Sequence, residues 1–228
     1  RIDFSHKSFR DGIRRNIKEE KRVHEKIWTW LDTLPEHEEV QELVYHMLQA
    51  DSKAAFLAEV AGRKGEEKFL KSAAKELAAY SQRDGGAWVA ESLETMPEDS
   101  ETIQRYLDFL LTCLDKEMGS SGEDGRTKER IYFAALPIEE KLVMACPEPE
   151  NRRSLSIMHS RLGYIYLNRE EEEEYRKALP HFQETLRISQ ELEREGATPR
   201  AKQDLSIDYR MLGKIYLKIG GEQNHRLV

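Results

Sequence analysis

A segment of fourteen residues occurs twice in the chain and constrains its fold more than any other feature. The copies are residues 155–168 (LSIMHSRLGYIYLN) and 205–218 (LSIDYRMLGKIYLK), and eight of the fourteen positions are identical. In each copy, large side chains recur at i, i+4, i+7 and i+11, a spacing that places them on one face of a helix. These side chains are Leu155, His159, Leu162 and Tyr166 in the first copy, and Leu205, Tyr209, Leu212 and Tyr216 in the second.

Both copies also place a glycine at the same position, Gly163 and Gly213. Glycine in the middle of a helix costs about 1 kcal/mol relative to alanine, because its backbone loses more freedom on folding. A repeated glycine there predicts a point where another helix packs too closely to leave room for a Cβ atom. Repeated helical units of this length are typical of an α-solenoid.

The first copy and the residues after it resemble the tetratricopeptide repeat. Leu162, Gly163 and Tyr166, followed by Ala178 and Phe182, are similar to the L-G-x-x-Y…A-x-x-x-F signature of that family. The resemblance implies units of two antiparallel helices whose stacked array binds a peptide or protein in a concave groove. It covers residues 127–221 and does not identify a partner.

The sequence departs from the family pattern at several positions. The spacing between Tyr166 and Ala178 is three residues longer, and the period exceeds the usual ~34 residues, which indicates extended helices. The leading Trp and the third small residue of the family are replaced by His159, Tyr209 and Thr185.

The N-terminal part resembles another family, the signal-transduction ATPases of the STAND or NACHT type. Phe4, His6, Phe9 and Asp11 are similar to the end of the winged-helix domain, and His24–Asp51 is similar to the helical region that follows it. In that family the matching His reaches the nucleotide phosphate, so the resemblance implies that His6 is a relic of nucleotide sensing. The chain begins without Met and stops before the second repeat unit is complete, so we expect a fragment of a longer polypeptide.

The apolar periodicity predicts an all-α fold of about ten to twelve helices, with an extended segment at most near Ile2–Phe4. Residues 1–118 are expected to form a helical bundle after the winged-helix-like end. Residues 127–228 are expected to form TPR-like helical-hairpin repeats, incomplete at the C-terminus. The polar segment Gly119–Arg126 is the predicted linker between them.

Local signals predict where individual helices begin, end and bury side chains. Residues 21–34 should bury Val23, Ile27, Trp30 and Leu34, with Pro35 ending the helix. Further helices are expected over residues 36–50, 52–62 and 66–83, and Asp84-Gly85-Gly86 should end the last of them. A short helix that carries Trp88 should follow, and after it a helix capped by Asp99 or Ser100.

Two prolines in the repeat region carry a prediction of their own. Each proline ends an Ala-Leu-Pro sequence, at Pro137 and at Pro180. Proline fits without a kink only in the first turn of a helix. We therefore expect the residues before each proline to belong to a separate turn or an earlier helix. The helix from Thr127 should end near Ala145, and the one from Ala178 should end at Gly196–Pro199.

Composition argues against several classes of function. A net charge of −7 disfavours a sequence-independent grip on nucleic acid phosphates and on an anionic membrane surface. No run approaches the ~20 apolar residues of a membrane span and no secretory leader is visible, so a soluble protein is expected. Cys113 and Cys146 are isolated, which predicts buried thiols in a cytoplasmic protein.

Motifs for catalysis, cofactors and metals are not found in the sequence. Gly62–Gly65 lacks the spacing and the Lys of a phosphate loop, and His24-Glu25 and His37-Glu38 lack the second His of H-E-x-x-H, because Trp28 and Gln41 stand there. No Ser lies in G-x-S-x-G. The sequence therefore predicts a protein that is not an enzyme, with no cofactor and no metal.

The resemblance to tetratricopeptide repeats implies a set of partner-binding positions on the first helix of each unit. Each set is spaced i, i+4, i+8, so it follows one face of a helix. The positions are Ser160, Tyr164 and Asn168 in one unit and Arg210, Lys214 and Lys218 in the next. The second trio is wholly basic, which suggests binding of an acidic peptide or a terminal carboxylate.

Alternatives to this interpretation stay open at the level of sequence. The basic trio could be an ordinary solvated helix face, or it could balance the negative charge of Glu170–Glu174. This acidic run is itself expected to be an exposed helix end or a docking site for a basic partner. The main hypothesis is a non-catalytic protein-interaction module, the sensor arm of a larger signalling protein. One alternative is a regulatory segment that couples ligand sensing to an upstream STAND-type ATPase, and a phosphate loop upstream of Arg1 would favour it. The other alternative is a structural or oligomerising array. The oligomeric state is left open.

Overall fold

The computed structural model describes residues 20–32, 40–63, 66–96, 99–119, 122–196 and 199–225. Within these ranges every regular element is a helix and no strand occurs, which confirms the predicted all-α class. The predicted extended segment Ile2–Phe4 and the candidate His6 lie outside the described residues.

The chain divides into two compact units. The first contains the described residues up to Arg83 together with Glu94–Glu117, and the second contains Asp84–Leu93 and the described residues from Met118 onward. The first unit holds α2 (Glu20–Leu31), α3 (Val40–Gln49), α4 (Lys53–Gly62), α5 (Glu67–Asp84), α7 (Ser100–Phe109), the π-helical turn η1 (Leu110–Leu114) and α8 (Asp115–Glu117). The proposed regions 1–118 and 127–228 stay a prediction.

Aromatic packing between α4 and α7 forms the centre of the first unit. Phe56 of α4 meets Tyr106 edge-on, with ring centroids 6.4 Å apart, and Tyr106 stacks on Phe109 at 6.0 Å. Asp99 caps α7 as predicted, because its side chain accepts a 2.8 Å hydrogen bond from the backbone N–H of Thr102. Such a cap contributes about 1 kcal/mol to the stability of the helix.

The predicted buried face of α2 is wrong in part. The structure buries His24 and Leu31, whereas Trp30 is 47% exposed. The reason is tertiary: α2 packs on α3, and the His24 ring lies against His46 of α3 with centroids 4.8 Å apart. Because of this contact, the face of α2 that packs on α3 differs from the face that carries the predicted apolar side chains. Leu34 and Pro35 lie outside the described residues.

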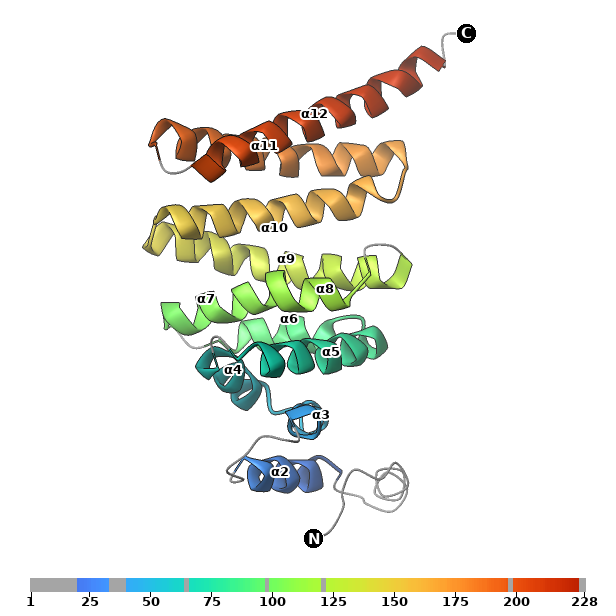
Figure 1. Ribbon diagram of the computed structural model, residues 1–228. Helices are drawn as coiled ribbons and strands as arrows, with labels where there is room; N and C mark the ends of the chain where they lie inside the picture. The colour runs from blue at the N-terminus through green and yellow to red at the C-terminus, as the bar shows by residue number, and fades with distance from the viewer. Residues whose placement is uncertain are drawn as a thin grey trace. The chain divides into compact units, whose positions relative to one another are not determined.

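The second unit is built from long helices that follow one another in antiparallel order. In Figure 1, α9 to α12 run back and forth, and each helix packs on the next. The repeated segments fall within α10 and α12, so their helical prediction is confirmed. The helices are α6 (Ala87–Glu94), α9 (Gly122–Ala145), α10 (Pro149–Leu167), α11 (Glu172–Arg194) and α12 (Pro199–His225).

The predicted breaks at Pro137 and Pro180 are wrong. Both prolines lie inside continuous helices, α9 and α11. Proline in a helix interior removes one backbone hydrogen bond and costs about 3 kcal/mol. In α11 that cost is offset by burial on both sides of the proline, because Ala178 and Phe182 are fully buried.

The predicted linker also differs from the structure. Residues 122–126 form the first turns of α9 rather than a loop, and Gly125 and Thr127 are buried there. The reason is packing against the start of α6, because a Cβ atom at Gly86 would lie 3.2 Å from the Thr127 side chain. A polar composition was therefore a poor guide to this segment.

The two repeated glycines have different surroundings. A Cβ atom on Gly163 would lie 2.5 Å from Cε2 of Phe182, so the predicted close helix contact is present there. A Cβ atom on Gly213 would meet nothing within 4 Å, so the same prediction is wrong at the second position. The two glycines share a sequence context but only the first has a helix packed on it.

This difference makes a matched pair of stability variants. Gly163→Ala should destabilise the chain by about 1–3 kcal/mol, because the fully buried Phe182 ring cannot move away from the new methyl group. Gly213→Ala should stabilise it by about 1 kcal/mol, because only helix propensity changes there. Urea unfolding followed by circular dichroism measures both effects. Equal shifts for the two variants would contradict the packing described here.

Candidate functional site

Several of the repeated positions have opposite exposures on α10 and α12. His159, Tyr166 and Leu167 on α10 are 9%, 4% and 6% exposed. Their counterparts on α12 are Tyr209, Tyr216 and Leu217, which are 55%, 53% and 77% exposed. The reason is that α10 packs against both α9 and α11, whereas α12 has α11 as its main neighbour among the described helices.

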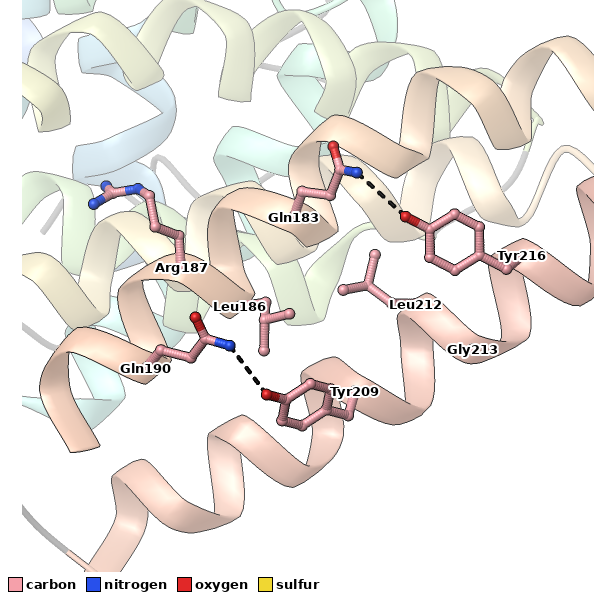
Figure 2. Close-up of a pocket in the computed structure, with 8 residues that line it drawn as sticks. All are labelled: Gln183, Leu186, Arg187, Gln190, Tyr209, Leu212, Gly213 and Tyr216. Carbon is pink, nitrogen blue, oxygen red and sulfur yellow. Dashed lines mark hydrogen bonds between the residues drawn. The ribbon is translucent and has the colours of Figure 1, made fainter. Parts of the chain in front are cut away.

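A groove follows the exposed side of α12 where it meets α11 (Figure 2). We call it the aromatic groove, and its volume is about 420 Å³. The hydroxyl oxygens of Tyr209 and Tyr216 accept hydrogen bonds from Gln190 at 3.0 Å and from Gln183 at 3.4 Å. The lining residues are Gln183, Leu186, Arg187 and Gln190 on α11 and Tyr209, Leu212, Gly213 and Tyr216 on α12.

The sequence pattern did not reveal this groove. Tyr209 and Tyr216 belong to the stripe that was expected to be buried in both copies. The spacing of the stripe is the same in both copies. Whether the stripe is buried depends on the neighbouring helices, and periodicity gives no information about them. The available signal was the higher charge of the second copy, in which Arg210, Lys214 and Lys218 stand where the first copy has Ser160, Tyr164 and Asn168.

Arg187 supplies the charged group of the aromatic groove. Its guanidinium donates to Glu184 at 2.9 and 2.6 Å and to Glu191 at 2.6 Å. The hydrogen bond with Glu184 raises the pKa of Arg187 above its ordinary value. The two carboxylates therefore hold the side chain along α11 and offset much of its charge.

A second cleft lies between α10 and α12 and contains two of the predicted binding residues, Ser160 and Tyr164. Its volume is about 350 Å³. Arg153 Nε donates to Asp204 Oδ2 at 2.9 Å, which ties α10 to α12 across the cleft. The other lining residues are Ser156, Ile157, Arg161, Arg200, Ile207 and Asp208.

The floor of this α10–α12 cleft is structural in part. Burial raises the pKa of the Asp208 carboxyl, although Ser189 donates a 2.6 Å hydrogen bond to it. Tyr164 packs edge-on against Phe182 with ring centroids 5.3 Å apart. Both residues therefore help to hold α10, α11 and α12 together.

The predicted basic trio lies on a different part of α12. Arg210, Lys214 and Lys218 are all exposed and line neither the aromatic groove nor the α10–α12 cleft. Lys218 Nζ lies 5.8 Å from the ring centroid of Tyr175. Among the described residues, Arg210 and Lys214 form no ion pair. We call these three residues the basic face.

Asn168 is separated from Ser160 and Tyr164. It ends α10 as the C-cap residue, and it lines a third cleft together with Arg126, Arg169 and Glu174. The six predicted binding residues therefore form three groups rather than one site. The basic face and the α10–α12 cleft are the two that lie along repeated helices.

The acidic run Glu170–Glu174 was expected to be exposed, and the structure corrects this for Glu174. Glu174 is buried in the first turn of α11 and accepts hydrogen bonds from Arg169 and Lys177 at 2.8 and 2.6 Å. Burial alone would raise its pKa, but the bonds from Lys177 and Arg169 outweigh burial and lower it. Arg169 also pairs with Glu129 of α9, so this corner joins three helices.

A histidine pair, His159 of α10 and His181 of α11, lies at the position that corresponds to Tyr209 of the aromatic groove. His159 Nδ1 and His181 Nδ1 are 3.0 Å apart, so one ring nitrogen donates a proton to the other. Burial lowers the pKa of His181 to about 4, with a further contribution from the charge on His159, and burial also lowers the pKa of His159. The pair is therefore neutral at neutral pH.

The described residues contain no group of three or more His, Cys, Asp or Glu side chains placed to hold a metal ion. None of their helices is both long enough and apolar enough to span a membrane. Cys113 and Cys146 carry free thiols that are half-buried, rather than buried as predicted.

The histidine pair predicts a loss of stability in mild acid. A His whose folded pKa is depressed contributes stability above its unfolded pKa of ~6.5, and this stability is lost as the pH falls toward the folded value near 4. His181→Gln should remove that part of the pH dependence, which we put at on the order of 1–2 kcal/mol after allowing for partial exposure. Urea unfolding of both proteins at about pH 7 and about pH 4.5 measures it. An unchanged difference between the two pH values would exclude this role.

Comparisons with known proteins found no relative of this chain. No protein-family model matches the sequence, and no curated protein or solved structure matches the chain. The resemblances to tetratricopeptide repeats and to STAND-type ATPases rest on the residues that carry them.

Proposed function

We propose that this chain is a non-catalytic protein-interaction module that binds an acidic peptide segment of a partner along α12. The observation that carries the proposal is the basic face. Arg210, Lys214 and Lys218 are exposed along one side of a helix in a chain whose net charge is −7. A concentrated patch of the opposite sign to the whole chain attracts a ligand of opposite charge selectively.

The chemistry of the three side chains fits carboxylates. Arginine presents a planar fork that can bind a carboxylate through two hydrogen bonds, and lysine acts as a mobile point charge. The side chains are spaced one helical turn apart, about 6 Å along the axis for each step of four residues. An extended peptide with an acidic residue at alternate positions has a similar repeat, because side chains on one face of a strand recur about every 7 Å.

The arrangement of the surrounding helices supports the same function. Helices α9 to α12 pack consecutively and in antiparallel order, and the Leu-Gly and Ala-x-x-x-Phe positions meet where Gly163 contacts Phe182. These features are consistent with TPR-like repeats of an α-solenoid, and we propose that architecture for the second unit. In such an array, function resides in the exposed faces of the helices rather than in a catalytic pocket.

Several polar side chains of the second unit are accounted for by contacts that hold its helices together. Asp208 bonds to Ser189, Glu174 to Arg169 and Lys177, and Tyr166 donates to Glu129 at 2.8 Å. These groups stabilise the helix pairs and are not paired with a nucleophile. Free thiols at Cys113 and Cys146 are consistent with the cytoplasmic location that we propose.

The proposal is tested by removing the basic face. The probe is a labelled Glu- and Asp-rich peptide with a free C-terminal carboxylate, and binding is measured by fluorescence anisotropy. Changing Arg210, Lys214 and Lys218 to Ala should weaken binding at least about tenfold and remove most of its dependence on salt between about 0.05 and 0.5 M. The fold should be intact because all three side chains are exposed.

A matched control removes three positive charges elsewhere. Lys68, Lys75 and Arg83 are exposed on α5 of the first unit, and changing them to Ala alters the net charge by the same amount. This control should bind the acidic peptide almost as well as the unmodified chain. Equal losses in the two triple variants would show a nonspecific charge effect, and unchanged binding in the Arg210, Lys214 and Lys218 variant would refute the proposal.

A further inference from the structure

The α10–α12 cleft gathers basic side chains from both of the helices that form its walls. Arg153 and Arg161 come from α10, and Arg200 comes from α12. Two carboxylates, Asp204 and Asp208, also line the cleft, so its charged side chains sum to a positive net charge in a chain whose overall charge is −7. Local positive charge in an acidic chain attracts an anionic ligand.

Both carboxylates of the cleft are already bonded to other groups of the protein. Asp204 accepts hydrogen bonds from Nε and Nη2 of Arg153 at 2.9 and 3.4 Å. Asp208 is 5% exposed and accepts a 2.6 Å hydrogen bond from Ser189 of α11. Arg161 and Arg200 are therefore the basic groups beyond the Arg153–Asp204 pair, and Arg200 forms no ion pair with another described residue.

Hydroxyl groups line the cleft beside the arginines. Ser156, Ser160 and Tyr164 follow one another at intervals of four residues along α10. A guanidinium donates two parallel hydrogen bonds to a phosphate, and hydroxyls can donate to the oxygens that remain. A carboxylate has only two oxygens and would use fewer of these donors. The set of donors therefore fits a phosphate group better than a carboxylate.

The polar lining also limits what can cover the cleft. It lies on the side of α12 that faces α10, where Ile207 packs against the core of the second unit. An apolar helix face laid over the cleft would take guanidinium groups out of water without giving them partners, which is strongly unfavourable. An anionic ligand provides those partners.

The cleft continues along α12 into the basic face. Because an α-helix turns about 100° per residue, Lys214 lies within about 20° of Ile207 around the axis of α12, two turns further along. Two turns correspond to about 10 Å, a distance that about three residues of an extended peptide span. One extended peptide can therefore contact both the cleft and the basic face.

We propose that the α10–α12 cleft binds the phosphate group of a phosphorylated serine in the partner's acidic peptide, while carboxylates of the same peptide contact the basic face. Arg161 and Arg200 bind the phosphate oxygens, and the hydroxyls of Ser156 and Ser160 donate to them. A phosphate monoester carries about −1.5 to −2 charges at pH 7, more than a carboxylate. This inference deepens the proposed function by naming a modification of the partner, and it rests on the proposed contact between the acidic peptide and the basic face.

Three labelled peptides test the inference by fluorescence anisotropy with the full chain. The first carries Glu at alternate positions and a serine about three residues before or after this run, in two versions for the two directions in which a peptide can lie. The second is the same peptide with phosphoserine, and it should bind at least about tenfold more tightly. The third has two Glu residues in place of the phosphoserine, and it should not reproduce that gain.

A variant of the cleft and a matched control give the second arm. Arg200→Ala should reduce the advantage of the phosphorylated peptide to less than about threefold and leave binding of the unphosphorylated peptide unchanged. The variant should fold, because Arg200 is exposed. Arg194→Ala removes the same charge from an exposed position at the end of α11, outside the cleft, and should leave the advantage unchanged.

The outcomes separate this inference from the proposed function. Loss of the advantage with Arg200→Ala but not with Arg194→Ala supports a phosphate site in the cleft. Equal binding of the phosphorylated and unphosphorylated peptides, an advantage that Arg200→Ala retains, or a gain that the peptide with two Glu residues reproduces overturns the inference. Displacement of the phosphorylated peptide by an equal concentration of inorganic phosphate would assign the cleft to free phosphate and would also overturn it. Failure of the proposed function is seen independently, as unchanged binding of the unphosphorylated peptide when Arg210, Lys214 and Lys218 are changed to Ala.

Discussion

The second unit depends on the close contact between Gly163 and Phe182. Because Gly163 has no side chain, α11 approaches α10 closely enough for the Phe182 ring to be completely buried. That ring belongs to a cluster that also contains Leu212 and Ile215 of α12. One residue on α11 therefore connects the helices on both sides of it, and the position of α12 follows from the same contact.

Polar contacts then determine how these helices are aligned along their axes. Arg153 and Asp204 join α10 to α12, Ser189 and Asp208 join α11 to α12, and Glu129 of α9 contacts Tyr166 of α10. Each joins side chains from different helices at a defined distance, so a shift by one turn would break it. Apolar packing supplies most of the stabilisation, and these bonds select one alignment among several that apolar packing alone would permit.

The sequence predicted the elements better than their environment. The Leu162 stripe, the break at Asp84-Gly85-Gly86 and the Asp99 cap were confirmed, because each is a local effect of periodicity or of backbone chemistry. The break at Pro180 was wrong, since burial of its neighbours outweighs the cost of proline. For the candidate site, the exposed basic positions could be placed from spacing, but the exposure of Tyr209 and Tyr216 depends on which helices are neighbours.

The two copies of the repeated segment lie in different surroundings. In α10, His159 and Tyr166 are enclosed by flanking helices and contact His181 of α11, so this face contributes to stability. In α12, Tyr209 stands at the position of His159, and the hydroxyls of Tyr209 and Tyr216 are bonded to Gln190 and Gln183 at the surface. A tyrosine tolerates this position because its ring is apolar and its hydroxyl is polar, so the ring can pack on the helix while the hydroxyl stays at the surface. Tyrosine therefore suits the partly exposed position on α12, whereas His159 suits the enclosed position on α10.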